Sequence, residues 1–134
     1  LYVVSDLDSI LPLSGMHDLY LRNPEPRTVV ILENADHFHF NDDVEANQDG
    51  FKSFMELAHA DADQETKRGL EEMLSLMKPS SELVPGSHAY TLINGLGLSH
   101  FDAHLRDHKG ATALLQRDLS SIMADHGITV SLMA

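Results

Sequence analysis

The chain of 134 residues contains no cysteine, which excludes disulfides, thiolate catalysis within the segment and cysteine-based zinc sites. This absence agrees with a reducing compartment, and we expect a cytoplasmic location. Basic residues are also scarce, because 9 Lys and Arg stand against 21 Asp and Glu and give a formal net charge of −12. Such a charge repels phosphate backbones and anionic membrane surfaces, so we expect no nucleic-acid and no membrane partner. No apolar run approaches the roughly 20 residues of a membrane helix, and the sequence predicts a soluble protein.

Two apolar runs, at residues 1–5 and 28–32, predict β-strands. Residues 14–22 between them predict a short helix, which is terminated by Asn-Pro-Glu-Pro at residues 23–26. A strand, a helix and a second strand in this order predict a parallel crossover unit of an α/β fold. Because Leu1 is not a methionine and already belongs to the first strand, we expect the chain to be part of a larger domain.

Everything after His37 is predicted to be helical. Apolar side chains recur at helical spacing and predict helices near residues 44–60, 64–78 and 88–108. Such an excess of helix needs a sheet to cover, which favours the α/β class. The apolar face of a last helix is formed by Leu115, Leu119, Ile122 and Met123.

An acid and a histidine follow the two predicted strands, since Asp8 comes after the first strand and His37 after the second. In open α/β sheets, ligands bind and catalysis takes place at the carboxyl ends of the strands. A carboxylate bonded to one imidazole nitrogen fixes the tautomer and stabilises the imidazolium that forms when the other nitrogen takes a proton. We therefore interpret Asp8 and His37 as a catalytic pair, with a carboxylate oxygen about 2.6–3.2 Å from an imidazole nitrogen.

Three stretches resemble parts of the α/β-hydrolases. Asp-Ser-Ile-Leu-Pro at residues 8–12 resembles the loop after the penultimate strand of that family, and Asn-Ala-Asp-His-Phe at residues 34–38 resembles the turn after its last strand. Residues 95–105 look like the late helix of dienelactone-hydrolase-like or acetylhydrolase-like esterases. Ser5 and Asn34 stand where the family usually has glycine, and asparagine tolerates the left-handed backbone region better than most residues.

The resemblance implies that residues 1–134 are the C-terminal part of a single α/β-hydrolase domain. It also implies that Asp8 is the acid that orients His37, and that His37 is the general base. The expected division is a strand–helix–strand unit at 1–40, a helical segment and candidate cap at 41–87, and C-terminal helices at 88–134.

The nucleophile of such an enzyme is absent, because no Gly-x-Ser-x-Gly elbow occurs in the chain. The resemblance therefore implies a serine or cysteine nucleophile upstream of Leu1, and we expect the 134-residue segment alone to be inactive. The implied activity is hydrolysis of an ester-type bond in a small-molecule substrate, without a cofactor. The sequence carries no signal for the oligomeric state.

Two alternatives remain open. Asp6 and Asp8 after an apolar strand also resemble the nucleophile motif of haloacid-dehalogenase-like phosphatases, with Asp42 and Asp43 as a magnesium pair, although the glycine and threonine of that motif are absent. The other alternative is a non-catalytic small α/β binding module in which Asp8 and His37 are incidental. That module predicts no hydrogen bond between the acid and the histidine.

Two groups of histidines raise the question of a metal site. His37 and His39 would lie on one face of a strand, where alternate side chains can chelate zinc. His100, His104 and His108 are spaced at i, i+4 and i+8 along a predicted helix. We favour a solvated helix face for the second group and predict no metal site.

Overall fold

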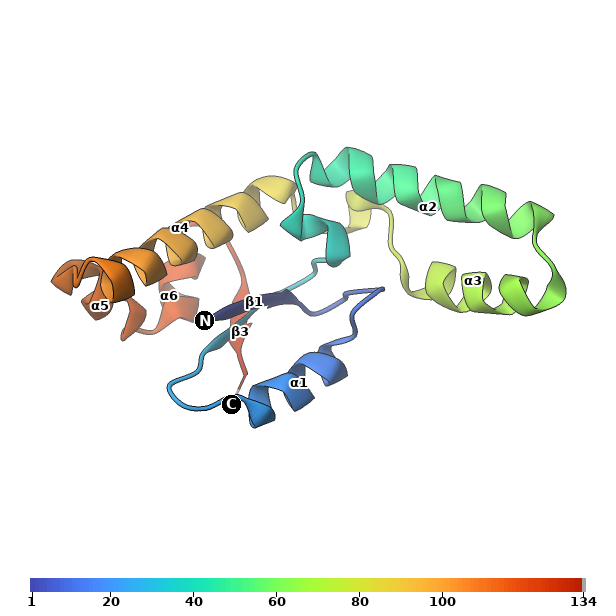
Figure 1. Ribbon diagram of the computed structural model, residues 1–134. Coiled ribbons are helices and arrows are strands. Elements are labelled where there is room, and N and C mark those ends of the chain that lie inside the picture. Colours follow the sequence, from blue (N-terminus) through green and yellow to red (C-terminus); the bar gives the residue numbers. More distant parts are fainter. Residues whose placement is uncertain (134) are drawn as a thin grey trace.

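The computed structural model describes residues 1–133 and has a mixed α/β fold, which confirms the predicted class. A three-stranded sheet contains β1 (Tyr2–Ser5), β2 (Val29–Leu32) and β3 (Val130–Leu132), in the order β1-β2-β3 (Figure 1). β1 and β2 are parallel, as the predicted strand–helix–strand unit requires. β3 pairs with β2 in the antiparallel direction.

The two faces of the sheet are covered by different helices, because side chains alternate along β2. Val29 and Ile31 belong to the core on the side of α1 (Leu13–Arg22). Val30 and Leu32 belong to the core on the opposite side. All four side chains are buried, which explains why the strand is apolar at every position.

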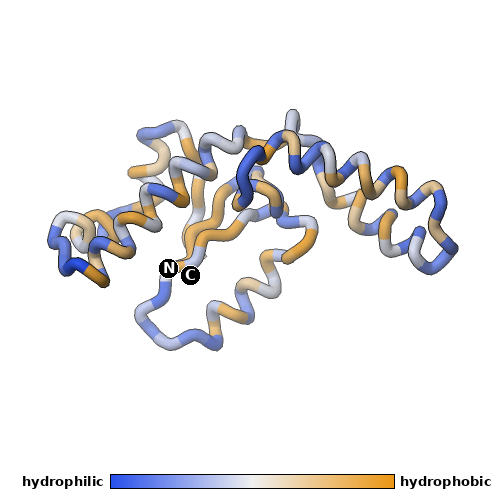
Figure 2. The backbone as a smooth tube through the Cα atoms, turned by 45° about the horizontal axis from the view of Figure 1, so that its top comes forward, coloured by the Kyte–Doolittle hydropathy of each residue, from blue (hydrophilic) through white to orange (hydrophobic). Residues whose placement is uncertain are grey.

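The larger core lies between the sheet and two helices, α4 (Gly86–Leu105) and α6 (Leu119–Ala124). α5 (Lys109–Leu115) packs against α4. Figure 2 shows hydrophobic residues concentrated along the strands. The buried members of this core are Val30, Leu32, Ala35, Ala89, Leu92, Leu96, Leu119, Met123, Ile128 and Val130.

α2 (Val44–Asp61) and α3 (Gln64–Leu76) form a helical hairpin, here called the arm. Both views show the arm extending away from the sheet (Figures 1 and 2). The helices that the sequence predicts at residues 44–60 and 64–78 are therefore present, with ends that differ by one or two residues.

Two carboxylates of α2 attach the base of the arm to the rest of the molecule. Glu45 accepts the Gly86 N–H at 2.7 Å, and chiefly this bond lowers the pKa of Glu45 below its usual value. Asp49 accepts the N–H and the hydroxyl of Ser80, at 2.7 and 2.6 Å, in the 3-10 helix η2 (Ser80–Glu82). The Ser80 hydroxyl and N–H together lower the pKa of Asp49. Each bond favours the charged carboxylate and holds α2 at this position.

The prediction that everything after His37 is helical is wrong, because β3 adds a third strand to the sheet. β3 has only three residues, too few for a recognisable strand pattern, and its place depends on pairing with a strand about 100 residues earlier. The predicted last helix is also wrong in detail, because α5 and α6 are two separate short helices. In the described residues 1–133, no helix combines the length and hydrophobicity needed to cross a membrane.

Candidate active site

The loop after β1 carries Asp8 and is held by hydrogen bonds to two carboxylates. Asp6 accepts the Ala35 N–H at 3.1 Å and so connects this loop to the turn after β2. Asp8 Oδ1 accepts the N–H groups of Ile10 and Leu11, at 3.0 and 2.6 Å. Such bonds from an aspartate to the following backbone stabilise a turn and restrict the carboxylate to one orientation.

The turn after β2 places His37 at the start of the 3-10 helix η1 (His37–Phe40). Asn34 reverses the chain with a φ of 55°, in the left-handed region that asparagine tolerates. The Asp36 carboxylate then caps η1 by accepting the His37 N–H at 2.6 Å. Asn34 thus occupies a backbone conformation for which glycine is the usual residue.

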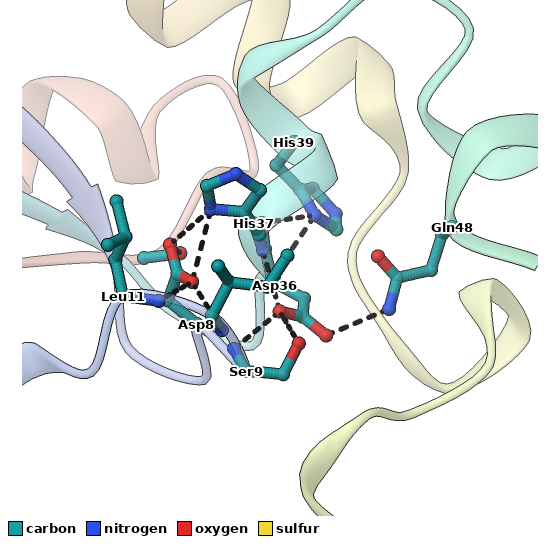
Figure 3. A network of polar contacts seen from close by, with 9 residues as sticks. Asp8, Ser9, Leu11, Asp36, His37, His39 and Gln48 are labelled. Atoms are coloured by element: carbon teal, nitrogen blue, oxygen red, sulfur yellow. Dashed lines mark hydrogen bonds and ion pairs between the residues drawn. The ribbon is translucent and has the colours of Figure 1, made fainter. Parts of the chain in front are cut away.

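Asp8 and His37 lie side by side, as Figure 3 shows. His37 Nδ1 is 3.2 Å from both Oδ1 and Oδ2 of Asp8, which is within the predicted hydrogen-bond reach. The Asp8 side chain is 8% exposed and that of His37 is 31% exposed. Because a carboxylate only accepts, Nδ1 of the neutral ring carries the proton and Nε2 keeps a lone pair. The arrangement therefore fits a histidine that takes up a proton at Nε2.

Asp8 and His37 line a cavity of about 280 Å³ between β1, α1 and η1. A larger cavity of about 530 Å³ lies at the other end of the strands, beside Leu1, Thr28 and His100, and contains no acid among its described lining residues. We assign the candidate site to the smaller cavity, because acid–base chemistry requires the paired groups. The other residues that line it are Val3, Val4, Leu11, Met16, Phe40 and Asn41.

A buried polar network lies behind the pair, and the sequence did not predict it. Asp36, His39 and Gln48 are each at most 1% exposed. The Asp36 carboxylate accepts hydrogen bonds from Ser9, His37 and Gln48. Asp36 stands directly before η1, where aspartate is a common capping residue, but two of its partners, Ser9 and Gln48, come from other segments of the chain.

His39 belongs to this network and not to a metal site. Its Nε2 is 2.8 Å from the Val84 carbonyl oxygen, so Nε2 donates, and Nδ1 accepts the Asp36 N–H at 3.0 Å. Both ring nitrogens are therefore occupied by backbone groups, and the zinc alternative for His37 and His39 has no support. Within residues 1–133, no three histidine, aspartate or glutamate side chains are placed to hold a metal ion.

The predicted ladder of three histidines is interrupted, because α4 ends at Leu105. His108 instead caps α5, where its Nδ1 accepts the Ala111 N–H at 3.1 Å. The rings of His100 and His104 lie 4.5 Å apart between centroids. Burial chiefly, together with the positive charge of His104, lowers the pKa of His100.

The support for a catalytic pair is the geometry of this chain. Asp8 and His37 stand at the carboxyl ends of adjacent parallel strands and are in contact beside a cavity. The chain matches no family model, no curated protein and no solved structure with which it was compared.

Proposed function

We propose that this chain supplies the acid, Asp8, and the general base, His37, of a nucleophile–acid–histidine triad that hydrolyses ester-type bonds. The observation that carries this proposal is the 3.2 Å contact of His37 Nδ1 with both carboxylate oxygens of Asp8. The motifs at residues 8–12 and 34–38 add to it, because they resemble the acid and histidine loops of α/β-hydrolases. In this proposal the chain is the C-terminal part of an α/β-hydrolase fold.

The proposed reaction has two halves that use His37 in the same way. Nε2 takes the proton of the nucleophile as the nucleophile attacks the ester carbonyl, and Asp8 stabilises the imidazolium. The imidazolium then returns the proton to the departing alcohol, and the acyl group stays on the nucleophile. Water next gives a proton to Nε2 and attacks the acyl group, and the imidazolium returns this proton to the nucleophile as the bond to the acyl group breaks and the acid is released.

The nucleophile belongs to a part of the protein outside residues 1–134. Its strand is expected to lie in a larger sheet beyond β1, because β1 pairs with β2 on only one edge within the described residues. The apolar side chains of Val3, Val4 and Leu11 at the cavity favour a small substrate with an apolar group. Residues 41–87 stay the candidate cap, but none of the described residues that line the cavity belongs to α2 or α3.

The test uses the protein expressed from the complete reading frame that contains this chain, with p-nitrophenyl acetate as substrate. His37→Ala removes the base and is expected to lower kcat roughly 10³-fold or more. Asp8→Asn is expected to lower kcat roughly 10³–10⁴-fold, because the ring loses the partner that selects its tautomer. A fluorophosphonate probe is expected to label a serine upstream of Leu1, or an iodoacetamide probe a cysteine, and more slowly in His37→Ala.

The matched control is His17→Ala, which removes an exposed histidine of α1. This variant is expected to keep wild-type kcat and KM. Equal turnover in His37→Ala and His17→Ala would refute a catalytic role for the pair. A wild-type protein that hydrolyses p-nitrophenyl acetate no faster than free imidazole does would also refute the esterase proposal.

The two alternatives have less support and different outcomes. A phosphatase would need Asp6 and Asp8 at a magnesium ion, whereas Asp6 is bonded to Ala35 and Asp8 to His37. Magnesium-dependent hydrolysis of p-nitrophenyl phosphate that Asp6→Asn abolishes would favour the phosphatase. A binding module in which the pair is incidental predicts no bond between acid and histidine, whereas His37 Nδ1 lies 3.2 Å from the Asp8 carboxylate. Such a module would hydrolyse neither substrate.

A further inference from the structure

Asp36 is a buried carboxylate that connects both loops of the candidate site. Its Oδ1 accepts the Ser9 N–H at 2.7 Å, the Ser9 hydroxyl at 2.8 Å and the His37 N–H at 2.6 Å. Its Oδ2 accepts Gln48 Nε2 at 2.8 Å. Figure 3 shows the carboxylate between the loop of Asp8 and the turn of His37.

Four donors contact the carboxylate, three at Oδ1 and one at Oδ2, whereas each oxygen has about two lone-pair sites, so Oδ1 is shared among three donors. This matters because the residue is only 1% exposed, and a buried carboxylate is costly unless it is fully hydrogen-bonded. Hydrogen bonds to a charged acceptor are also shorter and stronger than neutral ones. Asp36 therefore restrains its donors tightly.

The identity of the donors shows what is restrained. Ser9 is the next residue after Asp8, and the His37 N–H belongs to the proposed base itself. Three of the four bonds converge on one oxygen, Oδ1, so the backbones of the acid loop and the histidine turn are held against a single atom. A shift of either loop would break these bonds.

We propose that Asp36 is a positioning residue, which sets the distance between Asp8 and His37 and thereby the tautomer of His37. This role rests on the function proposed for the pair. Asp36 acts only through the two backbones and does not contact the reacting atoms. The Gln48 bond has a different effect, because it joins the carboxylate to α2 and contributes to stability more than to the geometry of the pair.

The experiment uses three variants of the protein expressed from the complete reading frame. Asp36→Ser keeps a hydroxyl that can cap η1, but it lacks the second oxygen and the reach to Ser9. Asp36→Asn is the conservative control, because its amide oxygen can replace Oδ1. Gln48→Met is the stability control, because it removes the bond to Oδ2 and the bond to the Lys78 carbonyl but leaves the three bonds at Oδ1 in place.

The first readout is the tautomer of His37, measured from ring ¹⁵N shifts and assigned by the signal lost in His37→Gln. The wild type is expected to carry the proton on Nδ1 at neutral pH. Asp36→Ser is expected to lose this preference and to lower kcat roughly 10²-fold with KM unchanged within about twofold, as a small misplacement of catalytic groups does. Asp36→Asn and Gln48→Met keep the tautomer, although Gln48→Met lowers the melting temperature.

The readouts separate this inference from the proposed function. If the Asp36→Ser variant folds and keeps the wild-type tautomer and kcat, the positioning role is wrong. The His37→Ala variant then still tests the proposed esterase activity. A tautomer change in a protein without esterase activity would support positioning and remove the proposed function. Hydrogen exchange of the Ser9 amide in the wild type needs no variant, and exchange as fast as in an open loop would also overturn the inference.

Discussion

Asn34 carries the turn that brings His37 back toward Asp8. Its φ of 55° lies in the left-handed region, which is unfavourable for most side chains and acceptable for asparagine and glycine. Its side-chain amide also donates to the Glu82 carbonyl at 3.0 Å, and its own carbonyl accepts the Val84 N–H. The residue therefore joins the histidine turn to the segment before α4.

Replacement of Asn34 separates the backbone effect from the side-chain bond. Asn34→Ala and Asn34→Gly both lose the bond to Glu82, and only alanine meets the left-handed penalty of roughly 1–2 kcal/mol. We expect Asn34→Ala to be less stable than Asn34→Gly by about 1 kcal/mol, as measured by urea unfolding. Equal stability of the two variants would show that the turn relaxes to another conformation.

At the scale of elements, α6 depends on the capping residue directly before it. Asp118 precedes this helix of six residues and accepts the N–H groups of Ser120 and Ser121 together with both serine hydroxyls. These bonds, those of the two hydroxyls first, lower the pKa of Asp118 to about 2 from a usual value of 3.8. The cap also separates α6 from α5, where the sequence predicted one helix.

The lowered pKa of Asp118 predicts how its contribution changes with pH. The ionised cap stabilises the fold fully above pH 3.8, and this contribution is lost as the pH falls through the folded-state pKa of about 2. The difference in urea midpoint between the wild type and Asp118→Ala is therefore expected to be constant from about pH 5 to pH 8 and to shrink below about pH 4.

Asp125→Ala is the matched control, because it removes the same charge at the other end of α6 and leaves the cap intact. Its midpoint difference is expected to show no such loss at acidic pH. If the Asp118→Ala difference persisted unchanged to pH 3, the serine hydrogen bonds would not act through the charged carboxylate.

At the scale of the whole molecule, the sheet has an open edge at β1. The N–H groups of Tyr2 and Asp6 donate to carbonyls on the side of β2, so those of Val3 and Ser5 point the other way. Within residues 1–133, no strand pairs with that edge. An apolar edge with unpaired backbone groups is a template for a further strand.

We expect the 134-residue chain, expressed alone, to self-associate through this edge. Sedimentation velocity would show an average mass that rises with concentration. Val3→Pro removes an edge N–H and is expected to reduce association, whereas Val3→Thr has nearly the same shape, keeps the N–H and is the matched control. A monomeric wild-type chain that melts cooperatively would contradict this expectation and favour the small binding module.

Local patterns were sufficient for the elements whose apolar residues form one short run or recur at helical spacing. β1, α1 and β2 were predicted from β-branched and helical spacing, and so were the two helices of the arm. The proximity of Asp8 and His37 was also predictable, because parallel strands bring their carboxyl ends to one edge of the sheet. The catalytic role of the pair stays a prediction.

The tertiary structure alone decided the rest, and the reason is the same at each position. β3 is too short to be recognised and forms because β2 offers a second edge. His39 has the same spacing as a metal ligand but is occupied by the backbone of Asp36 and Val84. Asp36 collects donors from three segments that are separate in sequence. A local pattern records which side chains must be buried, whereas the partners of a buried polar group depend on how distant segments pack.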